Sequence, residues 1–444
     1  MEKNINIVKG THDLIDEEME NYANLYRHFS FLATRYGYQE IMTPTIEHTN
    51  LFARSVGDSS DIVSKEMYTF MDKGDRSITL RPELTAGVLR AVVSNKMTAQ
   101  RDLPLRLFYI GSCFRYERPQ SGRYREFHQF GVETLGVKYP TEDLEVILLG
   151  MRCLEYADLT EIKIKINYLG NDETRNRYRE ALKEYFKGHI ENMCEDCKHR
   201  YETNPLRILD CKVESDKEII KGAPSILDFL SEEDRQKLDT IVDYLTHLQF
   251  KVEIDPTLVR GLDYYTGVVF EFHSAYADAP DFGAIGGGGH YSKLLSELGG
   301  PELEGCGFSF GMERVIALLS ALNKEVDPKQ TLDVYFIGMS EEAIRNNIFM
   351  AEVLRNAGIS VLLNHELRSM KSLMKYASKV NAKYVAIVGE DELDSKSVTI
   401  KDMVTGEQKT LEYIQFFQEI FQGVEKKRNE QEDEPNEKEE GGKA

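Results

Sequence analysis

The stretch FRYERPQSGRYREFHQFGVE, residues 114–133, consists of two β-type runs joined by a charged turn. Both runs are rich in aromatic residues, and the Ser-Gly pair between them is typical of a turn, so the pattern predicts a basic loop on an antiparallel hairpin. On a strand, Arg115 and Glu117 would lie on one face, since side chains alternate with a period of two. Guanidinium groups suit phosphate oxygens, and a carboxylate suits amino groups. A solvated charged hairpin explains any one of these residues, but the whole set, interleaved with Phe127 and Phe130, favours a binding site.

The sequence around this hairpin predicts a mainly antiparallel α+β body over residues 1–325. Helical spacing of apolar residues predicts a helix over 17–36 with a cap at Gly37. Residue patterns typical of β-strands occur at 36–47, 77–81 and 161–170, and again from 251 to 311. Between these runs, the sequence of about 172–250 is rich in charged residues and has a helical pattern, which predicts an inserted helical subdomain.

The pattern changes after a polar break at 323–330. Three short apolar runs, at 333–339, 359–364 and 384–389, alternate with helical segments at 341–357 and 366–380. This alternation predicts a C-terminal α/β domain with a largely parallel sheet over 331–422. Residues 426–444 are too polar to fold alone and are expected to form a disordered acidic tail.

Composition limits the classes of function. The 444 residues contain 55 Lys and Arg against 75 Asp and Glu, a net charge of −20, which excludes a uniformly basic nucleic-acid-binding surface but not a local basic groove. No apolar run approaches the roughly 18 residues of a membrane span, and the N-terminus carries no secretory signal pattern. Six cysteines in a chain of this length do not indicate a disulfide scaffold. We therefore expect a cytoplasmic protein with no membrane partner.

Residues 114–133 resemble motif 2 of the class II aminoacyl-tRNA synthetases, and their amino-acid sequence is similar to that of the histidyl-tRNA synthetase family. Further segments agree in the family's order: KGTHDL (9–14), YGYQEIMTPTIE (36–47), VRGLDYYTG (259–267), GGGGHY (286–291) and GFSFGMERV (307–315). The resemblance covers roughly residues 5–422. It implies a class II catalytic domain with an anticodon-binding-like domain at 331–422.

The resemblance implies that histidine and ATP form histidyl-adenylate and pyrophosphate, after which histidine passes to the 3′ end of tRNA-His. Because this reaction joins two anions, the site needs fixed cations. The family pattern assigns the α-phosphate to Arg115 and Arg260, which would be the catalytic pair. The implied ATP-binding residues are Arg115, Glu117, Arg123, Phe127 and Arg314. We expect Mg²⁺ to accompany ATP.

The resemblance also implies the histidine pocket. A carboxylate and a phenol can fix which imidazole nitrogen carries the proton, and the candidates are Glu133, Tyr265 and Tyr291. Contacts to the α-amino group are expected from Glu83, Thr85 and Gln129. The complete expected set is Glu83, Leu84, Thr85, Arg115, Gln129, Glu133, Arg260, Tyr264, Tyr265 and Tyr291.

The spacing Cys194-x₂-Cys197-x₁₃-Cys211, with His199 nearby, raises the question of zinc. A second paired half-site is missing from the sequence, so reduced thiols are the favoured interpretation and no metal site is predicted.

Partners and alternatives follow from the same text. Residues 36–47 resemble the class II dimer motif, so a homodimer is expected. Basic residues at helical spacing are candidate tRNA contacts: Arg368, Lys371, Lys375 and Lys379.

A dinucleotide-binding loop is disfavoured, because Tyr291 stands where GxGxxG needs glycine. A catalytically inactive paralogue, the regulatory subunit of ATP phosphoribosyltransferase, would lack the arginines and the C-terminal domain, and an RNA-binding module would need no ATP-binding arginines.

Overall fold

The computed structural model describes residues 5–56, 62–118, 122–137, 139–262, 264–326 and 332–433; beyond residue 423 it describes only the backbone. Parts of two predicted segments, residues 119–121 of the basic loop and Asp263, lie outside the described residues. The chain divides into two compact units, Met1–Asp327 and Pro328–Ala444. The division falls in the polar break between the two predicted domains.

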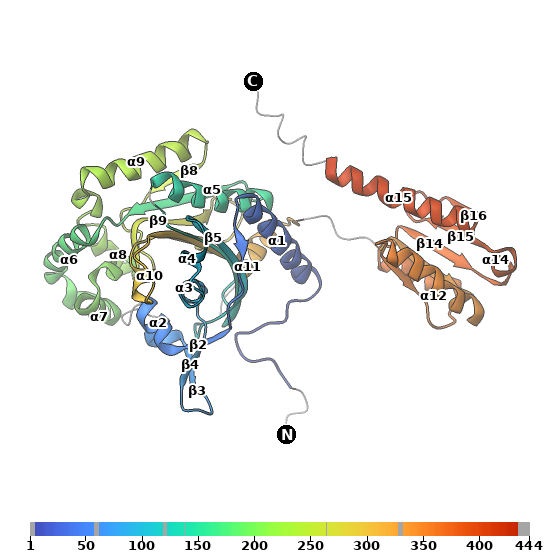
Figure 1. Ribbon diagram of the computed structural model, residues 1–444, viewed down its shortest axis with the longest axis horizontal. Coiled ribbons are helices and arrows are strands. Elements are labelled where there is room, and N and C mark those ends of the chain that lie inside the picture. The colour runs from blue at the N-terminus through green and yellow to red at the C-terminus, as the bar shows by residue number, and fades with distance from the viewer. Residues whose placement is uncertain are drawn as a thin grey trace. The chain divides into compact units, whose positions relative to one another are not determined.

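The first unit is built on an eight-stranded sheet with the order β1-β5-β6-β11-β10-β9-β7-β8 (Figure 1). All neighbouring strands are antiparallel except the outer pairs, β1 with β5 and β7 with β8, which are parallel. The predicted hairpin forms its second and third strands, and β5 and β6 pair along ten residues each. The strands are β1 Gln39–Glu40, β5 Leu105–Phe114, β6 Glu126–Leu135, β7 Ile162–Tyr168, β8 Lys251–Ile254, β9 Tyr265–Ser274, β10 Ala284–Tyr291 and β11 Gly305–Gly311. The mainly antiparallel α+β body is confirmed.

One face of this sheet is a closed apolar core. Even-numbered residues of β6 and β11, such as Phe130 and Phe308, point into it, as the strand period requires. It is covered by α1 (Asp16–Arg35), α5 (Pro140–Tyr156) and α11 (Met312–Ala321), and α9 packs on α5. Helix α1 carries acidic residues in its first turn, where they suit the helix dipole, and it is followed by Gly37 at φ +80°, as the predicted C-cap requires.

The opposite face carries the odd-numbered side chains, including Gln129 and Glu133. Helix α3 (Thr85–Ser94) lies over it with its neighbours α2, α4 and α10, at Thr49–Val56, Met97–Gln100 and Leu294–Glu297. A small antiparallel sheet of β2 (Ile46–His48), β4 (Ser77–Leu80) and β3 (Tyr68–Met71) adjoins it, with a π-helical turn at Ile62–Glu66. This face is not filled by apolar side chains alone, and it holds the candidate site.

The helical insertion joins β7 to β8 and appears in green beside the sheet in Figure 1. Its α-helices are α6 Asp172–Lys187, α7 Glu195–Thr203, α8 Glu214–Ile220 and α9 Glu232–His247. Short 3₁₀ helices separate them: η2 Ile190–Asn192, η3 Pro205–Asp210 and η4 Ile226–Phe229. Asn171 and Ser231 cap α6 and α9 by accepting backbone N–H groups. The core of the insertion is continuous with residues on the candidate-site face of the sheet.

The second unit is a five-stranded sheet with the order β13-β12-β14-β15-β16. Its first three strands are parallel, as predicted, while β15 and β16 are antiparallel additions that the sequence analysis did not identify. The strands are β12 Val334–Gly338, β13 Val361–Leu363, β14 Tyr384–Val388, β15 Ser397–Asp402 and β16 Gln408–Glu412; the helices are α12 Glu341–Asn356, α13 Met370–Lys379, α14 Glu390–Ser395 and α15 Tyr413–Asp433. Helix α15 includes residues 426–433, the first part of the expected tail, and 434–444 lie outside the described residues.

Candidate active site

A buried carboxylate lies at the centre of the open face of the sheet. Glu133 of β6 is 2% exposed, and three hydroxyl groups donate hydrogen bonds to it. Thr85 Oγ1 and Tyr109 Oη donate to Oε1 at 2.7 and 3.0 Å, and Tyr291 Oη donates to Oε2 at 2.8 Å. Burial raises the pKa of Glu133 to about 7, although these hydrogen bonds act in the opposite direction. The donors come from α3, β5 and β10, so the fold brings together segments that are remote in sequence.

Glycines in the neighbouring strands leave room for this cluster. Gly307 lies opposite Glu133 in the ladder, and a Cβ atom there would be 2.2 Å from the Glu133 Oε2. A Cβ on Gly305 would be 2.5 Å from the ring of Tyr291, and one on Gly287 would be 2.8 Å from Arg260 Nη1. The glycines of the segments 286–291 and 307–315 therefore leave space for the site's own side chains.

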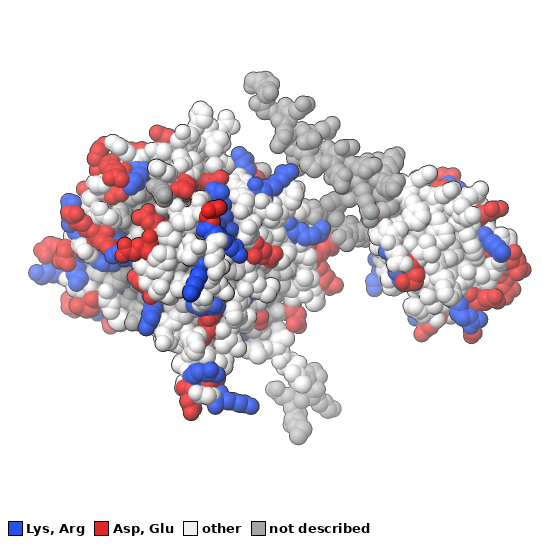
Figure 2. All heavy atoms as spheres, viewed as in Figure 1, with Lys and Arg blue, Asp and Glu red and all other residues white. Residues whose placement is uncertain are grey.

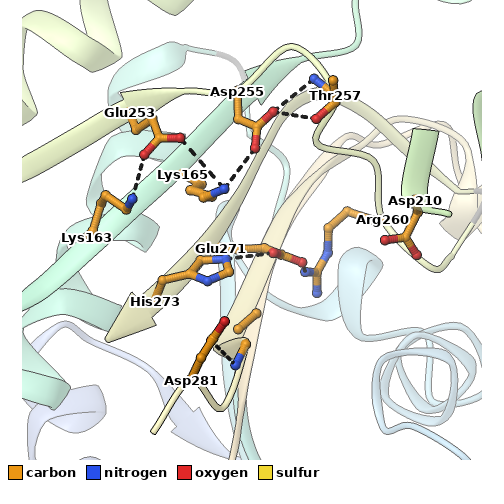
Figure 3. A network of polar contacts seen from close by, with 12 residues as sticks. Lys163, Lys165, Asp210, Glu253, Asp255, Thr257, Arg260, Glu271, His273 and Asp281 are labelled. Carbon is orange, nitrogen blue, oxygen red and sulfur yellow. Dashed lines mark hydrogen bonds and ion pairs between the residues drawn. The ribbon is translucent and has the colours of Figure 1, made fainter. Parts of the chain in front are cut away.

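Arg260 is paired with a glutamate on the sheet. Its Nη1 is 2.5 Å from Glu271 Oε1, and His273 Nε2 lies 2.9 Å from the other oxygen of the same carboxylate (Figure 3). Burial alone would lower the Arg260 pKa, but the charge of Glu271 raises it above the usual value. Its buried Nε has no hydrogen-bond partner among the described residues, and its guanidinium lies 5.9 Å from the ring centre of Tyr265. Arg260 is therefore a cation near a tyrosine ring, and its observed ion-pair partner is Glu271.

Three further arginines lie near the end of the β5–β6 hairpin. Arg115 donates from Nε to the Pro82 carbonyl at 2.8 Å and lies 5.1 Å from the ring centre of Phe127. Arg123 pairs with Glu117 at 3.7 Å, and its buried Nε has no partner within the described ranges. The pKa of Arg314 is lowered to about 10, first by burial and then by the positive charges of Arg123 and Arg115. A group of partly buried cations that repel one another is suited to an anion with several charges.

The start of α3 supplies the remaining candidates. Glu83 is buried and accepts from the backbone N–H groups of Thr85 and Ala86 at 2.7 and 2.9 Å. Burial raises its pKa. Leu84 is 2% exposed, and Gln129 lies on the same sheet face as Glu133 with its amide 3.4 Å from the Ser309 hydroxyl.

Two tyrosines complete the set. The rings of Tyr264 and Tyr265 are 4.5 Å apart, and the Tyr264 ring meets that of Tyr291 edge-on at 5.8 Å. Because Tyr291 binds Glu133 and Tyr265 faces Arg260, these rings connect the buried carboxylate to the buried cation.

One local prediction was wrong. Arg115 and Glu117 do not share a strand face, because β5 ends at Phe114 and both residues lie in the loop that follows. The backbone N–H of Arg115 still bonds to the Arg125 carbonyl, which keeps the loop next to the hairpin.

Sequence analysis missed three polar residues at the site: Tyr109, Glu271 and His273. Glu271 and His273 gave a signal, since they alternate with apolar residues in the run VVFEFHS (268–274). Tyr109 gave none, because a tyrosine in an apolar strand is usually a core residue.

Comparison with known proteins identifies the family. The family model described as histidyl-tRNA synthetase matches residues 10–315, and the model of the anticodon-binding domain matches residues 333–422. The chain belongs to the histidyl-tRNA synthetase family. The catalytic unit therefore has the class II synthetase fold, and the second unit is an anticodon-binding domain.

Curated relatives in this family are similar along nearly the whole chain. A histidine–tRNA ligase of Bacillus licheniformis is 45% identical over 93% of this chain and 98% of its own length. The histidine–tRNA ligase of Bacillus subtilis is 46% identical over 91% of this chain and 95% of its own length. Among solved structures, the apo histidyl-tRNA synthetase of S. aureus matches with a TM-score of 0.79 and 36% identity, covering 94% of this chain and all of its own.

A Bacillus halodurans structure described as an ATP phosphoribosyltransferase regulatory subunit/histidyl-tRNA synthetase shares the fold, with a TM-score of 0.62 at 24% identity. Fold similarity alone therefore does not separate the synthetase from the paralogue that the sequence analysis considered. Within the described part of the chain, every helix is too short or too polar to cross a lipid bilayer.

Proposed function

We infer that this chain ligates L-histidine to the 3′ end of tRNA-His in two steps, with ATP as the energy source. The observation that carries the inference is the buried Glu133 carboxylate, which lies among the hydroxyls of Thr85, Tyr109 and Tyr291. A carboxylate that accepts from hydroxyls, and has no ion pair with a basic side chain in the described part of the chain, suits the N–H group of a neutral imidazole. The arginines on the same face suit ATP.

In the first step, a histidine carboxylate oxygen attacks the α-phosphorus, and the bond from that phosphorus to the bridging oxygen of pyrophosphate breaks. Negative charge grows on the α-phosphate oxygens in the transition state. We assign its stabilisation to Arg260 and Arg115, and the β- and γ-phosphates to Arg123. The Nε–H groups of Arg260 and Arg123, which have no hydrogen-bond partner among the residues that the structure describes, support these roles.

Adenine is placed between Phe127 and Arg314, since a guanidinium and an aromatic ring both stack on a π surface. Glu117 would accept from the adenine amino group. ATP would bring Mg²⁺, a hard cation that prefers oxygen ligands, and the carboxylate of Glu271 beside Arg260 fits that preference.

The histidine itself is assigned to the interior of the face. Glu133, Tyr265 and Tyr291 would hold the imidazole, while Glu83, Thr85 and Gln129 would hold the α-amino group. Leu84 and Tyr264 close the walls. An amino acid without ring N–H groups would leave these buried polar groups unpaired, which favours histidine by up to about 10⁴-fold.

In the second step, a hydroxyl of the terminal tRNA ribose attacks the histidyl carbonyl, loses its proton and releases AMP. The tRNA would contact local basic residues, because acidic and basic side chains are mixed over the face of the first unit shown in Figure 2. Lys371, Lys375 and Lys379 are exposed on α13 of the second unit and are the proposed phosphate contacts there.

Histidine-dependent exchange of pyrophosphate into ATP tests the proposal. The full chain should show exchange with histidine and none with the other amino acids, in the absence of tRNA. No exchange under conditions where the protein is folded and binds tRNA would favour the inactive paralogue or an RNA-binding module.

We also propose that the chain acts as a homodimer in the cytoplasm. The segment 36–47 carries two apolar side chains that are exposed in the single chain, Met42 at 84% and Ile46 at 47%. An isologous interface would bury the same patch on both subunits. All six cysteines are free, as expected in a reducing compartment.

A further inference from the structure

Three cysteines and an aspartate meet inside the helical insertion, away from the residues assigned to histidine and ATP. One ligand atom from each of Cys194, Cys197, Cys211 and Asp216 lies within 4.8 Å of all the others. Cys194 is the N-cap of α7, Cys197 lies in its first turn, Cys211 follows η3, and Asp216 belongs to α8. The ends of three helical segments therefore converge on one point.

The spacing within this cluster fits a tetrahedral metal ion. Zn–S bonds of about 2.3 Å at tetrahedral angles place two sulfurs roughly 3.8 Å apart. Cys194 Sγ and Cys211 Sγ are 3.8 Å apart, and Cys211 Sγ is 3.4 Å from Asp216 Oδ2. A disulfide would need about 2.05 Å between the sulfurs, so these thiols are not bonded to each other.

The aspartate is an independent sign of a missing cation. Asp216 is 1% exposed, and among the described residues no lysine, arginine or histidine lies within ion-pair distance of it. It accepts from the backbone N–H of Cys194 at 3.0 Å and from the Ser215 hydroxyl at 3.3 Å. Buried carboxylates in proteins are paired with cations or coordinate metals, and here no side chain supplies the positive charge.

The surroundings also suit thiolate ligands. Cys194 and Cys197 lie at the N-terminus of α7, where the helix dipole favours negative sulfur. The backbone N–H of Val213 points to Cys211 Sγ at 3.5 Å. His199, which the sequence suggested as a fourth ligand, is exposed and is not part of the cluster.

We propose that Cys194, Cys197, Cys211 and Asp216 form a structural zinc site that holds the helical insertion together. The sequence favoured reduced thiols because it lacked a second ligand pair; Asp216 supplies the fourth ligand from a neighbouring helix. Four protein ligands and two fully buried sulfurs leave no open position for substrate, so the site is structural rather than catalytic.

The site is linked through η3 to the loop that carries Arg260. Segment η3 ends at Asp210, directly before Cys211, and its Arg207 donates from Nη1 to the Gly261 carbonyl at 3.0 Å. Fixing the end of η3 therefore fixes a contact to the residue next to Arg260. Loss of the metal is expected to loosen the insertion first and this loop second.

Metal content tests the proposal directly. Full-length protein is purified under reducing conditions without chelator, equilibrated with zinc, desalted and analysed by elemental mass spectrometry. We expect about one zinc per wild-type chain and at least tenfold less in Cys197→Ser and Asp216→Asn. Asp216→Cys, which restores a ligand, should retain zinc, and so should the control Cys153→Ala, which removes a buried thiol of the main core.

Two measurements on the wild-type chain keep the test valid even if a variant fails to fold. Replacement by Co²⁺ should produce the near-ultraviolet thiolate-to-cobalt absorption and the visible bands of a tetrahedral site. A strong chelator should lower the melting temperature of the wild type and of Cys153→Ala equally. Wild-type protein without bound zinc or cobalt, a Cys194–Cys211 disulfide in the native state, or full metal content in Cys197→Ser would each overturn the proposal.

Discussion

Glu133 combines two properties that are seldom found in one carboxyl group: it is 2% exposed, and no basic residue among those that the structure describes forms an ion pair with it. Three hydroxyls satisfy its oxygens, yet burial raises its pKa to about 7 against an ordinary value of 4.5. The folded chain thus retains a proton that the unfolded chain releases between these values. The contribution of Glu133 to the free energy of unfolding is fully present below pH 4.5 and is lost as the pH rises to about 7.

Replacing Glu133 with Gln should remove this pH dependence. The wild type should lose up to about 3 kcal/mol more stability between pH 4.5 and 8 than Glu133→Gln, from the pKa difference. Urea unfolding of the first unit, followed at both pH values, measures it. Glu191→Gln, at an exposed position of the same unit, is the control and should match the wild type. Parallel curves for wild type and Glu133→Gln would show that Glu133 does not titrate in this range.

Arg260 should act on the chemical step. Arg260→Ala is expected to lower kcat for adenylate formation by about 10²–10³-fold, the scale of one group that stabilises developing negative charge. Transfer from preformed adenylate should be affected less, because the α-phosphate is then leaving rather than under attack. Single-turnover kinetics of the two steps would separate these effects.

The alternative for Arg260 is a purely structural ion pair with Glu271, whose loss would leave a buried charge and destabilise the fold. Lys163→Ala is a matched control, since it breaks the nearby pair with Glu253 shown in Figure 3. If Arg260→Ala melts several degrees lower but activates histidine at the normal rate, the catalytic role is wrong.

At the scale of the element, strand β11 faces Glu133 with a glycine, Gly307, which has no side chain. Gly307→Ala would place a Cβ 2.2 Å from Glu133 Oε2 and 2.4 Å from the Val132 carbonyl, so β6 or β11 must shift. We expect a loss of about 1–3 kcal/mol in stability from overpacking and a raised KM for histidine. Gly188→Ala, with no atom near the added methyl group, should change neither quantity. A normal KM in Gly307→Ala would mean that Glu133 does not contact the substrate.

Helix α13 provides a second test at this scale. Arg368 precedes the helix and pairs with Glu366 at 2.8 Å, so Lys371 and Lys375 are the better candidates for tRNA phosphates. Their joint reversal to Glu should raise the KM for tRNA and flatten its dependence on salt, because fewer counterions are released on binding. Pyrophosphate exchange should stay unchanged. An equal loss in both assays would indicate misfolding.

At the scale of the whole molecule, the prediction concerns assembly. Met42→Glu places a charge in the proposed interface and should convert a dimer to monomers at micromolar concentration, with loss of activity. Val404→Glu, at an equally exposed position in the other unit, should remain dimeric. Sedimentation velocity distinguishes the two. A wild-type chain that is monomeric and fully active at that concentration would refute the dimer.

Prediction from sequence succeeded where local pattern and chemistry agree. Three features have a periodic pattern of apolar residues with clear ends: the β5–β6 hairpin, helix α1 with its glycine cap, and the helical insertion. It failed where an interaction depends on distant segments. The pairing of Arg260 with Glu271 joins a loop to a strand, and Asp216 reaches the three cysteines from a helix that has no cysteine of its own. Strands β15 and β16 were missed because their sequences contain many polar residues, as those of surface loops do.

Where the wall of a pocket is glycine backbone, mutation can only make the pocket smaller. A Cβ at Gly287 or Gly289, the two glycines of β10 on the site face, would lie 2.6 or 2.7 Å from a carbonyl oxygen of β9, so this wall has no side chain left to remove. Variants selected in the laboratory to charge bulkier analogues of histidine must therefore gain their space elsewhere. Tyr264 and Tyr265, whose rings lie 4.5 Å apart in the same site, are the positions where truncation to a smaller residue would create room. We expect such selections to return changes at these two tyrosines and to leave 286–289 untouched.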